Sequence, residues 1–517
     1  MKEVSDLNSK AKIGVSNLDD KVGYILVFLT SLIVMVFINR FSLLFSSFTA
    51  QDINVYSDIG RAAMHGKVLY KDVFDHKGPA FLMLYGIFGN LSDHNYLGQW
   101  ILFFISTFAF YLAVYKSTRL FSSAKTAYLS VPLAALLIYL KKSYYISCGT
   151  PEELFLPLYM WMIYGLLRCA KPEELSERTK MVLAAFLGAT TSFIFLAKMN
   201  LTLFPALASI YVFVSFWKCQ KSFPVKQTIA WVGGFLLIVL PIFIYMLCTH
   251  SYHDFIEAYF RFNAGYASDG KKSQNLVASL INAFLKILFH FPIHYIILIG
   301  GLLAASMKKL LNSEMILIFF LLGLSAQFSE LSSGRAYFYS ILPLIPFVCV
   351  SLSFLISLLD ATISKCVPAI VSVVGVLLSV VCVFENGAIW KSRIVHPEKS
   401  GMQILAEKIE ATYNKEGNPQ ILQYGYSADG IYTFTNTYPE FFYFYTPGDS
   451  NDYYEFIEEE QISYLEEGRA DYCVCTSLQE AYDWKIEQFN EHYVLIAKVE
   501  QKNEDSVWYI SLYQLAQ

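Results

Sequence analysis

Residues 52–79 concentrate ionisable side chains next to an apolar part of the chain. The segment ends in DHKGP, residues 75–79, so a carboxylate, an imidazole and an ammonium come directly before a proline. Proline favours the first turn of a helix, and a helix amino terminus attracts anions. Lys77 adds a full positive charge, so this point is suited to hold a phosphate group. The alternative is a set of solvated interfacial charges.

Asp52 opens this segment. Apolar residues recur at helical spacing over residues 55–63, which predicts a short amphipathic helix lying on the membrane surface and ended by Gly66. Asp52 comes just ahead of that helix, where a carboxylate can cap it, and capping is compatible with a role in chemistry. The apolar run 80–91 is too short to span a bilayer and predicts a second interfacial helix.

Two polar links between apolar runs offer further candidates. The first contains Lys198, which can bind an anion or simply extend its charge toward the membrane interface. The second contains Glu330 and Arg335, and a planar guanidinium in a tight loop near Tyr337 suits a bidentate grip on phosphate. The acids of GTPEEL, residues 149–154, most simply begin a helix, where negative charge is favourable.

The composition indicates that these residues lie beside a membrane. Of the 517 residues, 55% are hydrophobic and only 16% are charged, and the mean hydropathy is +0.42. Ordinary soluble domains carry about 25% charged residues. Apolar runs near the ~20 residues that span a bilayer recur from Gly23 to about Glu385 and then stop. The first run is too long for a cleavable signal peptide and predicts an uncleaved first span.

We expect eleven membrane-spanning helices. They cover residues 22–48, 96–115, 126–140, 153–168, 181–197, 201–217, 228–248, 281–306, 314–329, 337–358 and 366–385. Lysine and arginine are concentrated in short loops on the side of the amino terminus, at 116–125, 168–180, 218–226 and 308–309. By the positive-inside rule that side is cytoplasmic. The extracytoplasmic parts are then the loops at 49–95, 141–152, 249–280 and 330–336 and the tail from about 386.

The last part of the chain differs in composition from the rest. Residues 1–395 carry 32 basic against 21 acidic side chains, whereas residues 396–517 carry 7 against 22. Helices are expected over 402–413, 452–466 and 478–489, and strands over 420–426, 471–476, 493–499 and 507–514. This alternation predicts a small α/β domain. We assign it no chemistry, because its charges suit a solvated helix face and its aromatic residues 438–445 suit packing within the domain.

The chain is thus divided into a cytoplasmic segment, a membrane domain and an extracytoplasmic α/β domain, at residues 1–21, 22–390 and 391–517. The predicted fold class is an α-helical polytopic membrane protein with a small α/β domain at its carboxyl end. The polar loop at about 49–95 is the expected place of the chemistry.

Together these features resemble the GT-C class of membrane glycosyltransferases, specifically the bacterial relatives of protein O-mannosyltransferases and lipid A aminoarabinose transferases. The resemblance covers most of the chain. It rests on an acid after the first span, a Gly-x-x-x-Tyr-x-Asp stretch, an acid-Lys-Pro-like element and a Gly-Arg-x-Tyr link, carried by Asp52, by Gly66, Tyr70 and Asp72, by Asp75, Lys77 and Pro79, and by Gly334, Arg335 and Tyr337. The chain departs from the family where Ile53 replaces a second acid and where DHKGP replaces acid-Lys-Pro-Pro. These departures bear on the acceptor more than on the reaction.

The resemblance implies a polyprenyl-phosphate sugar as the donor. It assigns catalysis to Asp52, as the base on the acceptor, and to Asp75, which orients its neighbours. The lipid phosphate would be held by Lys77, His76, Arg335 and Lys198. Contacts with the acceptor or the sugar would come from Tyr70, Glu330 and Tyr337. Transfer from a sugar phosphodiester needs an activated hydroxyl and a stabilised departing phosphate, which a carboxylate and fixed cations supply.

We therefore expect a glycosyltransferase of the bacterial plasma membrane that transfers sugar to a cell-envelope acceptor on the extracytoplasmic face. The sequence has no Gly-x-Gly-x-x-Gly or Walker motif, which favours a lipid-borne donor, and no nucleic-acid partner is expected. No cofactor is expected either, although Asp52, Asp72 and Asp75 could bind a divalent ion. The alternatives are a transporter or flippase of lipid-linked glycans, and a glycan polymerase or ligase. A transporter would be indicated by a matching pair of discontinuous spans, and the sequence suggests no such pair, which counts against this alternative.

Overall fold

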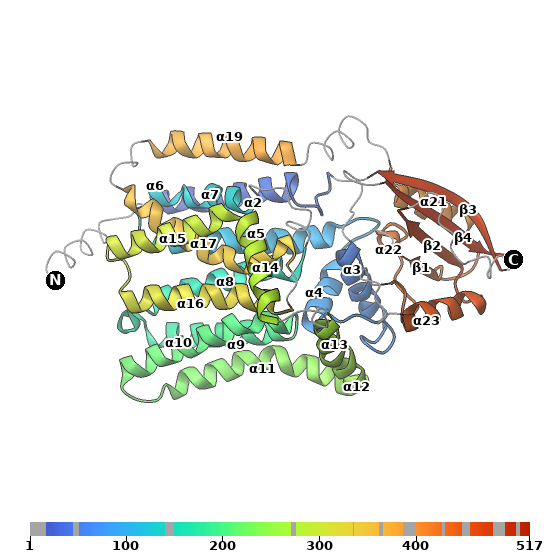
Figure 1. The fold of residues 1–517 in the computed structure, drawn as a ribbon, viewed down its shortest axis with the longest axis horizontal. Helices are drawn as coiled ribbons and strands as arrows, with labels where there is room; N and C mark the ends of the chain where they lie inside the picture. The colour runs from blue at the N-terminus through green and yellow to red at the C-terminus, as the bar shows by residue number, and fades with distance from the viewer. Residues whose placement is uncertain are drawn as a thin grey trace.

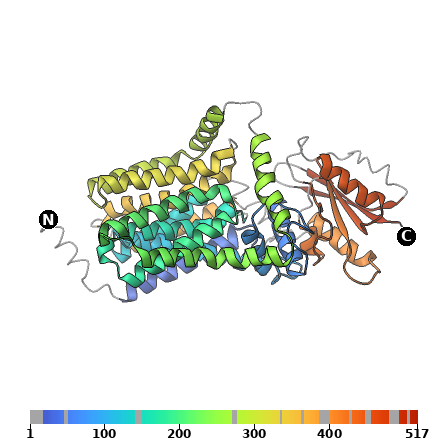
Figure 2. The ribbon, with the colours of Figure 1, turned by 90° about the horizontal axis from the view of Figure 1, so that it is seen from below.

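The computed structural model describes residues 17–44, 51–139, 149–269, 276–333, 336–360, 366–385, 399–425, 430–446, 455–478, 492–502 and 507–516. Its long helices run side by side along the long axis of the molecule, and a small β-sheet lies at one end (Figure 1). A quarter turn about that axis leaves the same arrangement of bundle and sheet (Figure 2). The loops at 169–176, 221–224 and 308–312 lie together at the end away from the sheet (Figure 1).

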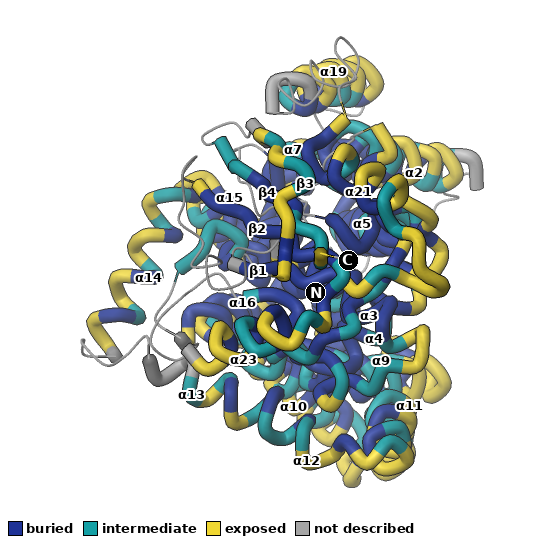
Figure 3. The backbone as a smooth tube through the Cα atoms, turned by 90° about the vertical axis from the view of Figure 1, so that its right-hand side faces the viewer, coloured by how far each residue is buried: buried dark blue, intermediate teal, exposed yellow. Residues whose placement is uncertain are grey.

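The bundle helices are α2 (Asn17–Phe37), α5 (Leu97–Thr118), α6 (Ala124–Ala127), α7 (Ser130–Tyr139), α8 (Pro151–Arg168), α9 (Glu177–Phe195), α10 (Leu203–Gln220), α11 (Val225–Cys248), α15 (Pro292–Met307), α16 (Ser313–Glu330), α17 (Ile345–Leu358) and α19 (Val367–Glu385). The short helical turns are η1 (Pro172–Glu174), η2 (Met199–Thr202), α12 (Tyr252–Phe255), the π-helix η3 (Ile256–Arg261), α13 (Phe262–Asp269), η4 (Leu331–Ser333) and η5 (Phe338–Leu344). Outward faces of α11, α14 (Leu276–His290) and α19 are exposed (Figure 3), as expected of apolar helices that face lipid.

Within the described part of the chain, six helices are long and apolar enough to cross a membrane, and a bent pair brings the number to seven. The six are Asp19–Phe37, Leu97–Thr118, Met199–Gln220, Val225–Cys248, Ser313–Glu330 and Phe338–Leu358. Each overlaps a predicted span, although the first helix ends at Phe37 and its predicted span extended to residue 48. The predicted spans at 126–140 and 366–385 coincide with shorter apolar helices. Those at 153–168 and 181–197 coincide with α8 and α9, which run within the bundle (Figure 1). The full number of eleven stays a prediction.

The segment predicted as one span, 281–306, is a bent pair of helices, which counts as one span if the two cross the membrane together. α14 (Leu276–His290) and α15 meet at an angle of 88°. Pro292 is the first residue of α15, and proline has no N–H to donate to the preceding turn, so a straight helix is not favoured through this point. α14 consequently stands across the direction of the bundle helices (Figure 1).

The polar segment singled out in the sequence forms two helices between the bundle and the sheet, α3 (Gln51–Met64) and α4 (Pro79–Gly89) (Figure 1). As predicted, α4 begins with Pro79 at its first helical position. α3 and α4 touch through Gly60 and Gly86, whose backbones are so close that a Cβ on either residue would overlap the other. The two glycines therefore allow a contact that larger residues would prevent.

The position of α3 on the membrane surface stays a prediction, but the helix is covered by protein on both sides. Residues 53–62 are all buried. The polar side of the helix is covered by the C-terminal part of the chain, since Arg61 donates hydrogen bonds to Asn436 Oδ1 at 2.5 Å and to the Tyr432 carbonyl oxygen at 3.4 Å. The predicted end of the helix is confirmed, because Gly66 follows Met64 closely and has a left-handed φ of 97°.

The C-terminal sheet has four strands in the order β1-β2-β4-β3, with β1 parallel to β2 and the other pairs antiparallel. The strands are β1 (Ile421–Gly425), β2 (Tyr472–Ser477), β3 (Tyr493–Lys502) and β4 (Val507–Leu515), and all four lie where they were predicted. The helices of this region are α21 (Gly401–Thr412), α22 (Ile431–Phe434) and α23 (Glu455–Glu466). The helix predicted over 478–489 falls almost entirely outside the described residues.

Candidate active site

A tight loop between α3 and α4 carries four of the nine predicted site residues, namely Tyr70, Asp75, His76 and Lys77. Within it Tyr70 has a left-handed φ of 68°, and its N–H donates to the Val73 carbonyl oxygen at 3.0 Å. The Tyr70 hydroxyl donates to the Lys77 carbonyl oxygen at 2.7 Å. Burial raises the pKa of Tyr70 well above its ordinary value, so the phenol stays protonated and remains a donor. Tyr70 thus fixes the loop, and its contact with acceptor or sugar stays a prediction.

Gly78 brings this loop against the end of α9. The Gly78 N–H donates to the Ala197 carbonyl oxygen at 3.0 Å, and the Ala80 N–H donates to the Leu196 carbonyl oxygen at 3.0 Å. A Cβ on Gly78 would overlap the Leu196 carbonyl group. Glycine is therefore needed for this backbone contact, which brings the loop next to Lys198.

Asp75 is a buried carboxylate, only 1% exposed. Its Oδ1 accepts a hydrogen bond from the Lys77 backbone N–H at 2.6 Å, and its Oδ2 accepts one from the Tyr445 hydroxyl at 3.1 Å. Burial raises the pKa of Asp75, while Lys77 and Tyr445 act in the opposite direction. This geometry suits the orienting role that the resemblance implies, and a direct catalytic role of Asp75 stays a prediction.

His76 and Lys77 form a pair at the mouth of the loop. The Lys77 Nζ lies 2.7 Å from His76 Nε2 and 5.4 Å from the centre of the Tyr56 ring. Burial, followed by the charges of Lys77 and Lys198, holds the pKa of His76 well below its ordinary value. A lysine ammonium only donates hydrogen bonds, so the neutral imidazole accepts one at Nε2. Lys77, which is half-buried, is then the cation of the pair.

Lys198 lies at the centre of a buried ion-pair network. Its Nζ is 3.1 Å from both carboxylate oxygens of Glu330 and also contacts Glu152. Burial opposes the charge of Lys198, but the two carboxylates outweigh burial and raise the pKa of the lysine above its ordinary value. The ammonium is thus already engaged by acids from α8 and α16. Its predicted contact with a lipid phosphate, and that of Glu330 with acceptor or sugar, stay predictions.

Asp52 is exposed in the first turn of α3, which begins one residue earlier. Negative charge is favourable in this first turn, and the capping alternative stays a prediction. Asp52 lies close enough to Tyr56 and Tyr339 for its charge to act on both phenols. Lys198 Nζ lies 5.5 Å from the centre of the Tyr339 ring, and that ring stacks on Tyr337 with their centres 5.2 Å apart. Asp52 therefore faces the same region as Lys198.

Arg335, predicted to hold the lipid phosphate, lies outside the described residues. Among the residues that the structure describes, no group of three or more His, Cys, Asp or Glu side chains is placed to hold a metal ion. Asp72, one of the three acids considered for a divalent ion, accepts a hydrogen bond from the Val68 N–H at 2.7 Å.

The sequence interpretation missed three residues that contact this site. Glu152 and Glu153 both lie in the first turn of α8, as predicted, but Glu152 also contacts Lys198, whereas Glu153 accepts a hydrogen bond from the Gly149 N–H at 2.7 Å. Tyr56 lies one helical turn after Asp52, a spacing that could have identified it as a neighbour. Tyr445 lies 370 residues from its partner, and no local pattern indicates that contact.

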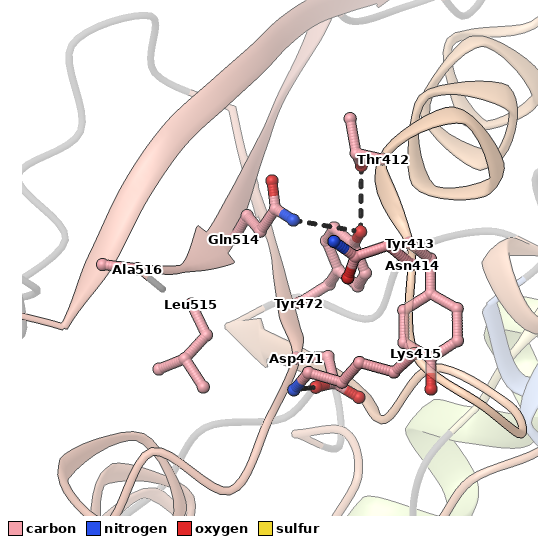
Figure 4. Close-up of a pocket in the computed structure, with 9 residues that line it drawn as sticks. All are labelled: Thr412, Tyr413, Asn414, Lys415, Asp471, Tyr472, Gln514, Leu515 and Ala516. Carbon is pink, nitrogen blue, oxygen red and sulfur yellow. Dashed lines mark hydrogen bonds and ion pairs between the residues drawn. The ribbon is translucent and has the colours of Figure 1, made fainter.

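A separate cavity of about 80 Å³ lies at the edge of the C-terminal sheet (Figure 4). Its polar side chains pair with one another: Lys415 contacts Asp471, and the Tyr472 hydroxyl lies 2.9 Å from Thr412 Oγ1 and 3.3 Å from Gln514 Nε2. We therefore place no reaction there. The loop site has an exposed carboxylate on Asp52 and a half-buried ammonium on Lys77.

No protein-family model and no curated protein sequence matches the chain. Solved structures do match. The crystal structure of ArnT from Cupriavidus metallidurans bound to undecaprenyl phosphate is 13% identical, with a TM-score of 0.58 over 96% of this chain and 98% of that chain. The apo structure of the same protein is 12% identical, with a TM-score of 0.54 over 95% of this chain and 98% of that chain.

The oligosaccharyltransferase of Archaeoglobus fulgidus, in complex with Zn and sulfate, also matches at 13% identity, over 88% of this chain and 67% of that chain. Its TM-score of 0.42 is too low to carry an argument. The two ArnT structures cover nearly the whole chain, at identities that establish the fold alone. The chain therefore has the fold of ArnT, and with it the fold of the GT-C class.

Proposed function

We propose that this protein is a membrane glycosyltransferase that moves a sugar from a polyprenyl-phosphate donor to a cell-envelope acceptor on the extracytoplasmic face. The observation that carries the proposal is the gathering of Asp52, Lys77 and Lys198 around Tyr56 and Tyr339 on an ArnT-like fold. The ArnT structure in the comparison is bound to undecaprenyl phosphate, which supports a polyprenyl phosphate as the partner.

The proposed topology has eleven spans, a cytoplasmic amino terminus and an extracytoplasmic sheet. It is supported by the basic loops after α8, α10 and α15, which lie together at the end of the bundle away from the sheet (Figure 1). The ionisable residues of the site belong to the opposite end, since Glu152 is in the first turn of α8 and Glu330 is the last residue of α16. The proposed location is the bacterial plasma membrane.

In the proposed reaction Asp52 takes the proton of an acceptor hydroxyl while the hydroxyl oxygen attacks the anomeric carbon of the sugar. The bond between that carbon and the phosphate oxygen breaks, and the lipid phosphate leaves with the electron pair. Lys77 stabilises the charge that develops on this phosphate, and Arg335 is proposed to join it. The carboxylic acid of Asp52 then returns its proton to solvent.

The alternatives are a flippase of lipid-linked glycans and a glycan polymerase or ligase. The break between α14 and α15 is a discontinuity of a kind found at transporter binding sites. Transporters, however, bind near the middle of the membrane, whereas the charged network here joins helix ends at one end of the bundle. This difference favours the transferase.

The test measures sugar transfer by purified protein in nanodiscs, with polyprenyl-phosphate sugars as donors. Mass spectrometry of surface glycans from cells with and without the gene identifies the sugar and the acceptor. Asp52→Asn keeps the shape of the side chain but removes the base, so donor binding should survive while turnover falls by about 10²–10⁴-fold. Glu459→Gln, in an exposed acid of α23, is the control. Turnover by folded Asp52→Asn protein at the parent's rate would refute the assignment. Movement of intact donor across vesicles without transfer would identify a flippase.

A further inference from the structure

The C-terminal part of the chain reaches the loop that carries Lys77. We propose that Tyr445 is a positioning residue, which holds Asp75 so that Asp75 in turn holds the Lys77 backbone where its ammonium meets the donor phosphate. This inference rests on the proposed function and adds to it, since the C-terminal domain was assigned no chemistry.

A continuous chain of hydrogen bonds supports the proposal. The Tyr445 hydroxyl donates to Asp75 Oδ2 at 3.1 Å, and the Lys77 N–H donates to Asp75 Oδ1 at 2.6 Å. One buried carboxylate thus receives one donor from the C-terminal domain and one from the loop. Hydrogen bonds to a charged acceptor are stronger and more directional than neutral ones, so a change at one oxygen affects the orientation of the other.

The backbone around Tyr445 is docked on the same loop. The Phe74 N–H donates to the Phe442 carbonyl oxygen at 3.0 Å, and the centre of the Phe74 ring lies 5.3 Å from that of Tyr443. Lys67 and Glu440 form an ion pair farther along the same contact. The position of Tyr445 is therefore set by several contacts that do not depend on its hydroxyl, so Tyr445→Phe should preserve the docking.

The charge of Asp75 depends on the groups that face it. They are Asp52 and Tyr56 from α3, Tyr70, His76 and Lys77 from the loop, and Tyr445 from the C-terminal domain. Burial and Asp52 raise the pKa of Asp75, whereas Lys77 and the Tyr445 hydroxyl lower it. Loss of that hydroxyl should raise the pKa further, so Asp75 would lose its charge at a higher pH.

The first measurement is the affinity of purified full-length protein for undecaprenyl phosphate between pH 5 and 9. Tyr445→Phe should weaken binding by about 2–10-fold, the usual effect of one hydrogen bond, and the pH below which binding weakens should move upward. Tyr443→Phe removes a hydroxyl two residues away and should change neither quantity. A role of Tyr445 in packing alone would lower the melting temperature without moving the pH profile, and that result would overturn the proposal.

A double-mutant cycle tests the route through the carboxylate. In an Asp75→Asn background, Tyr445→Phe should have little further effect on binding, because the charge that it modulates is gone. Effects that simply add would overturn the proposal.

A measurement without lipid separates this inference from the proposed function. The reaction of Lys77 with a small amine reagent, relative to that of exposed Lys71, should increase in Tyr445→Phe and stay unchanged in Tyr443→Phe. If this increase were seen but the parent bound no undecaprenyl phosphate, the positioning of Lys77 by Tyr445 would be supported and the donor assignment would be wrong. Unchanged labelling of Lys77 in Tyr445→Phe would overturn the inference, whatever the parent binds.

Discussion

The ammonium of Lys198 lies 3.1 Å from both carboxylate oxygens of Glu330, a residue 132 positions away. Both side chains are largely buried, and Glu152 completes the network from a third helix. The network therefore joins the end of α9, the end of α16 and the start of α8 directly beside the loop site.

Lys198→Met should destabilise the protein strongly, because it leaves Glu152 and Glu330 buried without a countercharge. Removing one partner of a buried ion pair costs about 3–5 kcal/mol. The measurement is the melting temperature in detergent. Glu330→Gln, which leaves Lys198 paired with Glu152, is the comparison and should cost less. Equal losses in the two variants would contradict a network centred on the lysine.

Lys77→Ala should mainly weaken binding of the donor lipid. A hydrogen bond to a charged group contributes about 1.5–3 kcal/mol, which corresponds to an affinity for undecaprenyl phosphate lower by about 10–100-fold. Turnover should fall as well, since the same ammonium stabilises the leaving phosphate. Lys71→Ala removes an exposed lysine from the same loop and is the matched control. Unchanged donor affinity in Lys77→Ala would move the phosphate site elsewhere.

Asp58→Asn should stabilise the protein above neutral pH. Asp58 is fully buried in α3, neither of its carboxylate oxygens has a hydrogen-bond partner among the described residues, and burial raises its pKa to about 8 against the opposing charge of Arg61. The folded protein then keeps a proton up to about pH 8 that the unfolded chain releases near pH 4. Stability is thus lost as the pH rises through this interval, by up to about 1.4 kcal/mol per pH unit.

The check is the melting temperature of parent and Asp58→Asn at pH 5 and pH 8. Between pH 5 and pH 8 the melting temperature of the parent should fall by more than that of the variant, because asparagine has no proton to release. An equal loss in the two proteins would mean that Asp58 is already ionised in the folded state.

A fourth prediction concerns the orientation in the membrane. In a variant without natural cysteines, a thiol reagent added from outside should label Ser268→Cys, in α13, and should not label Lys221→Cys, in the loop between α10 and α11. Labelling of the second thiol alone would reverse the proposed topology and place the site in the cytoplasm. Labelling after the membrane is made permeable shows that both thiols can react.

Local patterns predicted the elements whose causes are local. Pro79 marks the start of α4, Gly66 ends α3, and runs of β-branched and aromatic residues correspond to the four strands. The bend at Pro292 was missed because proline is tolerated in membrane helices and its effect depends on the surrounding packing.

Contacts between distant segments could not be predicted in this way. The pairing of Lys198 with Glu152 spans 46 residues, and the acid already had a sufficient local explanation at a helix start. The burial of α3 was missed because its hydrophobic pattern predicts burial of only one side of the helix. Its other side is covered by residues such as Asn436, which lies 375 positions from Arg61.

The Asp75–Tyr445 hydrogen bond can form only late in the synthesis of the chain. Its two partners are separated by 370 residues, so a ribosome that adds 5–20 residues per second reaches Tyr445 about 20–70 s after it has passed Asp75. For that interval the Asp75 loop is present without one of its hydrogen-bond donors. A nascent chain that has already inserted its membrane helices therefore still lacks the complete site. The loop gains this hydrogen-bond donor only when the C-terminal part of the protein has been made.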